Sequence, residues 1–137
     1  MKVATLSLTA GIVILMVIGG GSYAQTPSSP KTFDIGIATP LTGPAAHIGM
    51  NMKNALLIAI EDQNAQGGVK IAGEKYLLNP VILDTKKDAA VGKAVAEQLV
   101  YDKKVKVIAG PFIDDSIGAQ SVTEPNKIIA FFVTPST

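Results

Sequence analysis

The stretch FDIGIATPLT, residues 33–42, decides the fold class of this chain. Apolar residues alternate with small or polar ones along its first half, and a proline stands on either side of the alternating part. This period of two predicts a β-strand that ends at Pro40. Prolines and glycines crowd residues 40–49, so an irregular loop is expected there, before an apolar helix over residues 48–66. The loop follows the carboxyl end of a strand, which is where open α/β sheets bind ligands.

Strands and helices alternate along the rest of the chain. The hydrophobic patterns predict further strands over residues 76–83, 105–109 and 128–133, and helices over residues 89–101 and 116–123. Pro80 cannot donate a hydrogen bond to a neighbouring strand, so the strand that contains it is expected at a sheet edge. The alternation predicts an α/β fold: a three-layer, Rossmann-like parallel sheet with crossover helices. Numbered along the chain, its strands are expected in the order 2-1-3-4.

Local features refine these expectations. The helix over residues 48–66 is apolar all round near its middle, which predicts cover on more than one side. Gly110-Pro111 is expected to end the third strand. Asp84 and Asp88 resemble a carboxylate pair, but their places at a strand end and a helix start favour capping of the helix that begins at residue 89.

The first 24 residues have the pattern of a cleavable signal peptide. Lys2 supplies the positive charge, residues 3–18 are almost wholly apolar, and small residues before Gln25 suit a signal peptidase. The predicted organisation is a signal peptide (1–24), a polar lead (25–31) and an α/β lobe (32–137), with export to the periplasm. The alternative is an uncleaved membrane anchor, although the apolar run is shorter than the roughly 20 residues that a membrane span prefers.

Composition excludes several classes of function. The chain has no cysteine, so disulfides, thiolate metal sites and a lipid anchor on cysteine are ruled out. Removal of Lys2 with the leader would leave equal numbers of basic and acidic residues, which argues against nucleic acid as a partner. Glycine-rich phosphate loops and the G-x-S-x-G elbow are absent, and His47 is the only histidine. We therefore expect no catalytic residues, no cofactor and no metal site.

Three loops are expected to meet at one rim of the sheet, because they follow parallel strands. These are residues 41–49, 111–116 and 134–137. Backbone amides at the starts of two helices, together with hydroxyl side chains, would dominate this rim. The hydroxyls belong to Thr42, Ser116, Ser136 and Thr137. Such a rim suits a small polar ligand held without catalysis.

Five motifs carry a resemblance to a known family. In chain order they are IGIATPLTGPAAHIG, NAQGG, LDTKKDA, VIAGP and VTPST. Together they make residues 33–137 similar to the substrate-binding proteins of branched-chain amino acid ABC transporters, which are type I periplasmic binding proteins. The resemblance implies two lobes that close on a ligand, of which this chain would hold an incomplete first lobe. It also implies binding of a branched-chain amino acid or similar small amphipathic solute, delivery to an inner-membrane ABC permease, and a monomer when complete.

The resemblance assigns roles to particular residues. In the family the loop after the third strand supplies a hydroxyl to the ligand, and the residue at that place here is Asp114. An unpaired carboxylate there would repel a ligand carboxylate, so either Asp114 faces an ammonium group or the ligand differs. Ser116 would replace the hydroxyl after a small shift of the loop. The alternative is that Asp114 and Asp115 cap a helix that begins before Ile117.

The remaining predicted contacts lie in the first and last loops. Ser136 and Thr137 stand where the family places ligand contacts after the fourth strand. Ile48 stands where some amino acid binders have an aromatic ring, which implies an aliphatic contact. His47 lacks metal-binding partners and is expected to face solvent or pack in the loop.

Two further alternatives remain open at the level of sequence. An uncleaved leader would make the chain a membrane-anchored extracellular sensing module of the same fold. A truncated product without binding activity is the other alternative. It would leave Ile128, Phe131, Phe132 and the helix face around Leu57 exposed and adhesive, because their cover would come later in such proteins.

Overall fold

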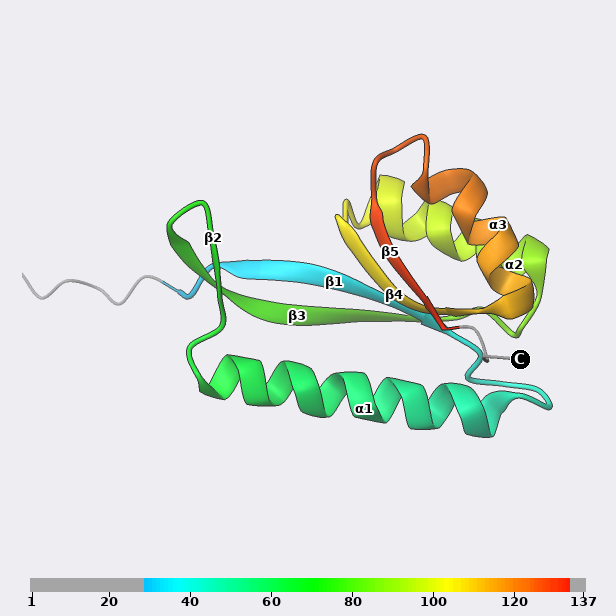
Figure 1. The fold of residues 1–137 in the computed structure, drawn as a ribbon, viewed down its shortest axis with the longest axis horizontal. Helices are drawn as coiled ribbons and strands as arrows, with labels where there is room; N and C mark the ends of the chain where they lie inside the picture. Colours follow the sequence, from blue (N-terminus) through cyan, green and yellow to red (C-terminus); the bar gives the residue numbers. More distant parts are fainter. Residues whose placement is uncertain (1–28, 134–137) are drawn as a thin grey trace, which may run out of the picture.

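The computed structural model describes residues 29–133, which form one five-stranded sheet between two layers of helices (Figure 1). The predicted leader lies outside these residues. In chain order the elements are β1 (Thr32–Thr39), α1 (Ala46–Ala65), β2 (Val69–Ile71), β3 (Glu74–Asp84), α2 (Ala89–Glu97), the π-helical turn η1 (Gln98–Asp102), β4 (Val107–Phe112), α3 (Ile113–Thr123) and β5 (Ile129–Val133). The sheet order is β2-β3-β1-β4-β5, and β3, β1, β4 and β5 are parallel. The predicted order 2-1-3-4 is therefore confirmed for the four parallel strands.

Strand β1 lies at the centre of the sheet and is covered on both faces. Ile35 and Ile37 face α1, where they line the same cavity as residues of that helix. Gly36 faces the opposite layer, where an added Cβ would lie 2.9 Å from a methyl carbon of Leu99. Alternation in β1 thus separates large side chains on one face from small ones on the other, and the small ones let η1 approach closely.

Strand β2 was not predicted and changes the environment of β3. A two-residue turn, Ala72-Gly73, has φ values of 50° and 90° and joins β2 to β3 as an antiparallel hairpin. Positive φ at both central residues is the geometry of tight hairpin turns. The pairing with β2 ends at Tyr76, so the edge-strand prediction is wrong for the start of β3. It holds for the part around Pro80, beside which no described strand pairs on that side.

Strand β4 continues past its predicted end. Gly110 has a φ of 101°, and the register with β5 shifts between Ala109 and Phe112. Glycine absorbs this irregularity because it tolerates positive φ, so the pair Gly110-Pro111 makes a bulge in the strand instead of ending it. Helix α3 then begins directly at Ile113, three residues earlier than predicted.

Helices α2 and α3 pack against each other through two glycines. A Cβ added to Gly118 would lie 1.9 Å from the carbonyl oxygen of Ala89, and one added to Gly92 would lie 2.5 Å from that of Asp115. Neither neighbour is a flexible side chain, so the two backbones are as close as they can be.

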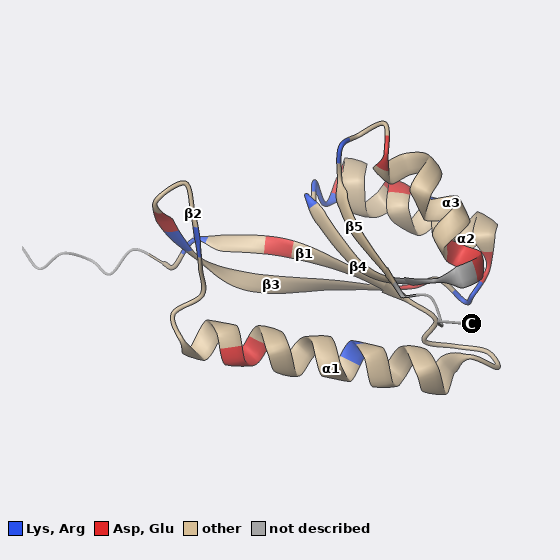
Figure 2. Ribbon diagram, viewed as in Figure 1, with Lys and Arg blue, Asp and Glu red and all other residues tan. Residues whose placement is uncertain are grey.

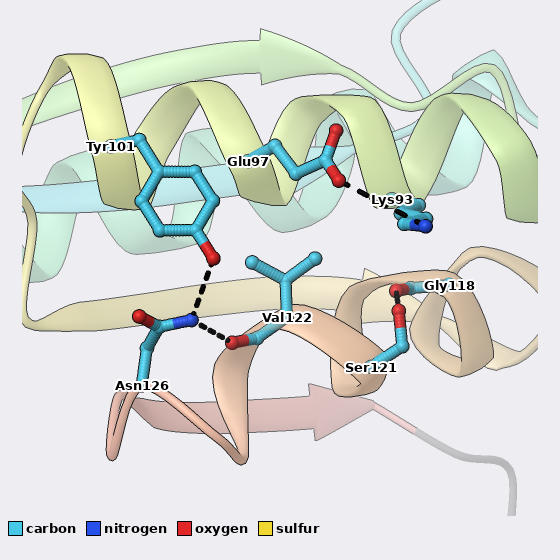
Figure 3. Close-up of polar contacts among 7 residues, drawn as sticks. All are labelled: Lys93, Glu97, Tyr101, Gly118, Ser121, Val122 and Asn126. Atoms are coloured by element: carbon cyan, nitrogen blue, oxygen red, sulfur yellow. Dashed lines mark hydrogen bonds and ion pairs between the residues drawn. The ribbon is translucent and has the colours of Figure 1, made fainter.

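A polar contact closes the far end of the same helix pair (Figure 3). The Asn126 side-chain amide donates to the hydroxyl of Tyr101 at 2.9 Å and to the carbonyl of Val122 at 2.8 Å. Tyr101 belongs to η1 and Val122 to α3, so this one amide ties the two elements together.

The main core lies between the sheet and the layer of α2 and α3. Its buried members are Ala38, Val95, Leu99, Val105, Ile108 and Ile128. Ile128 is therefore buried among described residues, and Phe132 is half-buried against Ala96 and Val122. The expectation that both need later parts of the chain for cover is wrong.

The opposite face of the sheet is covered only in part. Helix α1 lies along this face (Figure 1), and a cavity of about 310 Å³ separates it from β4 and β5. Ile58 of α1 is 60% exposed, and Ile129 and Phe131 of β5 are 58% and 62% exposed. Within the described residues α1 is thus covered on one side only, and Phe131 is exposed as the sequence predicted.

The contact between α2 and α3 predicts the effect of one substitution. Gly118→Ala should lower the free energy of unfolding by about 1–3 kcal/mol, because the new methyl group has no room against Ala89. At an exposed helix site the same change would stabilise the protein by about 1 kcal/mol. Ser121→Ala, an exposed site in the same helix, is the matched control. Urea unfolding followed by circular dichroism measures both variants, and a Gly118→Ala protein as stable as wild type would contradict the packing.

Candidate functional site

The carboxyl ends of three parallel strands form the rim of the candidate site. Thr39 of β1 pairs with Asp84 of β3, and Ile37 of β1 pairs with Ala109 of β4. The loop between β1 and α1, residues 40–45, therefore lies between the β3–α2 loop and the start of α3. The predicted meeting of loops at one sheet edge is confirmed for the β1–α1 loop and the start of α3. The β3–α2 loop, which was not predicted there, lies at the same edge, and residues 134–137 lie outside the described part.

Asp84 joins two of these loops through its carboxylate. One oxygen accepts hydrogen bonds from the backbone N–H groups of Leu41 at 2.8 Å and Lys86 at 2.9 Å. The other accepts a hydrogen bond from the hydroxyl of Thr42 at 2.5 Å. The predicted capping role is wrong for Asp84, which binds loop groups and not helix amides. It is confirmed for Asp88, whose carboxylate accepts from the N–H of Val91.

The environment of Asp84 lowers the pKa of its carboxyl group. Partial burial raises that pKa, but hydrogen bonds from the Thr42 hydroxyl and from the backbone groups of Leu41, Lys86 and Thr42 together outweigh it. The ionised form is favoured because it accepts all of these bonds. The link between the two loops is therefore strongest when Asp84 carries its charge.

The predicted ligand contacts lie at this rim as far as they are described. Thr42 is exposed in the β1–α1 loop, Ile48 is 37% exposed in the first turn of α1, and Ser116 is half-buried in α3. Ser136 and Thr137 lie outside the described residues. His47 is exposed, as expected.

Asp114 lies in the first turn of α3 and has a partner. Because α3 begins at Ile113, Asp114 and Asp115 lie inside the helix, and the alternative that they cap it before Ile117 is wrong. A carboxylate in the first turn is favoured by the helix dipole. The Asp114 carboxylate also lies 3.5 Å from the ammonium group of Lys87, in a region where Figure 2 shows acidic and basic residues together. Because Lys87 pairs with the Asp114 carboxylate, the predicted repulsion of a ligand carboxylate by an unpaired Asp114 does not apply.

A cavity of about 390 Å³ opens beside this ion pair, between the β1–α1 and β3–α2 loops. Its lining consists of Pro44, Ala45, His47, Ile48, Lys86 and Lys87. Sequence reasoning missed both lysines. The signal was present in LDTKKDA, because two adjacent lysines in a short loop at the carboxyl end of a strand are placed at the ligand-binding edge.

The described groups of the rim are hydroxyls, backbone amides, carboxylates and ammonium groups. Across residues 29–133 no group of three or more acidic or histidine side chains is placed to hold a metal ion. In the same span, no helix has the length and apolar character needed to cross a bilayer. The arrangement can hold a small polar or charged molecule by hydrogen bonds and ion pairs.

The Asp84 contacts predict a pH-dependent stability. Since the folded-state pKa is lowered, the stabilisation is present above the unfolded-state pKa of about 3.9 and is lost as the pH falls through the lower folded value. Asp84→Asn should lower the free energy of unfolding at neutral pH by about 1–3 kcal/mol and flatten its decline in acid. Asp88→Asn is the control, because asparagine caps helices as well as aspartate does. Equal pH profiles for wild type and Asp84→Asn in urea unfolding would contradict this role.

Comparison with known proteins identifies the family of this chain. Residues 32–137 match the family described as periplasmic binding protein. The leucine-, isoleucine-, valine-, threonine- and alanine-binding protein of Pseudomonas aeruginosa is 32% identical over 137 residues, which cover 99% of this chain and 34% of that protein. The chain thus spans about a third of the length of the relatives that it matches.

Solved structures share the fold. The branched-chain amino acid transporter substrate binding protein LivJ of Streptococcus pneumoniae, in complex with isoleucine, superimposes with a TM-score of 0.70 at 23% identity, over 77% of this chain and 30% of that one. The ABC transporter solute binding protein of Rhodopseudomonas palustris, in complex with 3,4-dihydroxy benzoic acid, gives 0.65 at 25% identity, over 77% and 28%. The sheet of this chain corresponds to part of a type I periplasmic binding protein. The chain belongs to the periplasmic binding protein family.

Proposed function

We propose that this chain is the solute-binding component of an ABC importer. It would bind a branched-chain amino acid or a similar small amphipathic solute at the rim and deliver it to a membrane permease. The observation that carries the proposal is the 32% identity to an amino acid binding protein across 99% of the chain. The sheet supports it, because its parallel strands bring loops with hydroxyls and helix amides to one edge.

We propose further that the protein is exported and has two lobes. Residues 1–24 would be removed as a signal peptide, and residues 32–137 would form part of the first lobe of a periplasmic monomer. The second lobe would close over the rim and supply most contacts to the ligand side chain. No catalytic residue, cofactor or metal has a part in this function.

The proposed ligand contacts differ in chemistry. Thr42 donates its hydroxyl proton to Asp84, so its remaining lone pairs would accept a hydrogen bond from a ligand ammonium group. Ser116, Ser136 and Thr137 would bind the polar groups of the ligand, and Ile48 would contact its apolar part. Asp114 is 58% exposed despite its ion pair, which leaves its carboxylate open to an ammonium group.

The test is isoleucine binding by the native protein, purified from its own cells and studied by titration calorimetry. We expect L-isoleucine to bind and Ser116→Ala to weaken binding by about threefold to tenfold, as for loss of one hydrogen bond. Ser121→Ala is the matched control, because Ser121 lies in the same helix and donates to the carbonyl of Gly118. Absence of isoleucine binding to the wild-type protein would refute the function, and equal losses in both variants would refute the role of Ser116. The mass of the native protein shows in addition whether it begins at Gln25.

A further inference from the structure

The cavity between the β1–α1 and β3–α2 loops has walls of different chemistry. Pro44, Ala45 and Ile48 form an apolar wall from the first loop and the start of α1. Lys86 and Lys87 form the opposite side, from the loop before α2. The volume, about 390 Å³, lies in the range of small-molecule sites. A cavity lined by apolar residues of one loop and by lysines of the other suits a molecule with an apolar body and a negative charge.

The two lysines are not equivalent. Lys87 forms an ion pair with Asp114 at 3.5 Å. Lys86 forms no ion pair with any side chain of residues 29–133. No acidic residue is among those that line the cavity. A ligand ammonium group would find no counter-charge there, whereas a ligand carboxylate would meet Lys86.

Neighbouring carboxylates are held in other contacts. Asp84 accepts hydrogen bonds from Leu41, Thr42 and Lys86. Asp88 accepts from the N–H of Val91 in α2. Both carboxylates are thus engaged by backbone N–H groups near the cavity. The hydrogen bond that the N–H of Lys86 donates to Asp84 also holds the loop that carries this lysine.

We propose that this cavity is an anion subsite in which Lys86 binds the carboxylate of a small monocarboxylic acid while Ile48 and Pro44 contact its apolar body. The inference rests on the proposed function. It restricts the class of solute to molecules whose carboxylate, and not an ammonium group, binds in this cavity. An acid without any amino group therefore binds here.

The experiment compares benzoate with benzamide, which has the same shape without the charge. The native protein, labelled with nitrogen-15, is titrated at millimolar concentrations and followed by the backbone amide signals of residues 45–48 and 85–88. We expect benzoate to shift these signals and benzamide not to. Lys86→Gly should weaken benzoate binding about tenfold or more, and Lys86→Arg should retain it.

A matched control separates charge from backbone effects. Lys86 has a φ of 53° and Lys104 a φ of 57°, so glycine relieves the same left-handed conformation at either site. Lys104 precedes β4 at the opposite end of the parallel strands, away from the cavity. Lys104→Gly should therefore leave benzoate binding unchanged.

The remaining outcomes overturn the inference in distinguishable ways. Benzamide that binds as well as benzoate, or equal binding by wild type and Lys86→Gly, would refute the anion subsite. If L-isoleucine still binds in that case, the proposed function stands without the subsite. If neither benzoate nor L-isoleucine binds, both the inference and the proposed function are wrong.

Discussion

The parallel pairing of β1 with strands on both sides is the constraint on which the site depends. Hydrogen bonds to β3 on one side and β4 on the other fix the direction of all three strands. Their carboxyl ends must then meet at one edge, which brings together loops from distant parts of the sequence. Gly36 leaves room on one face of β1 for Leu99, whose nearest methyl carbon would lie 2.9 Å from an added Cβ. The small residue in the middle of the central strand thus lets η1 approach the sheet closely.

Asp84 links two of the loops that meet at this edge. Leu41 and Asp84 are 43 residues apart in sequence, yet one carboxylate binds groups of both loops. A carboxylate suits the role because it is acceptor-only and can serve several donors at once. The same contacts set the direction of the Thr42 hydroxyl proton, so a residue that would touch no ligand determines whether Thr42 presents a donor or an acceptor.

Sequence patterns predicted the parts of the fold that depend on local periodicity. The alternation in β1, the cap at Asp88 and the order of the parallel strands are all confirmed. Strand β2 was missed because three residues are too few to show a period. The bulge at Gly110 was missed because a Gly-Pro pair equally predicts a strand end. At the site, Thr42, Ile48, Asp114 and Ser116 lie at the predicted edge of the sheet. The two lysines in LDTKKDA were a signal that was missed. The pairing of Lys87 with Asp114 and the cavity beside Lys86 depend in addition on contacts between separate loops, which no single motif shows.

The two sides of the rim are held by different contacts. Gly92 and Gly118 bring α2 and α3 together backbone to backbone, which fixes the start of α2 against the first turns of α3. The β1–α1 loop packs closely at its start, where a Cβ added to Gly49 would lie 1.8 Å from the carbonyl oxygen of Pro40, whereas one added to Gly43 would meet nothing within 4 Å. Leu41 and Thr42 are joined to the β3–α2 loop by hydrogen bonds to Asp84. The position of the middle of the β1–α1 loop therefore depends on one carboxylate, and a substitution at residue 84 would displace Thr42 while leaving the contact between α2 and α3 intact.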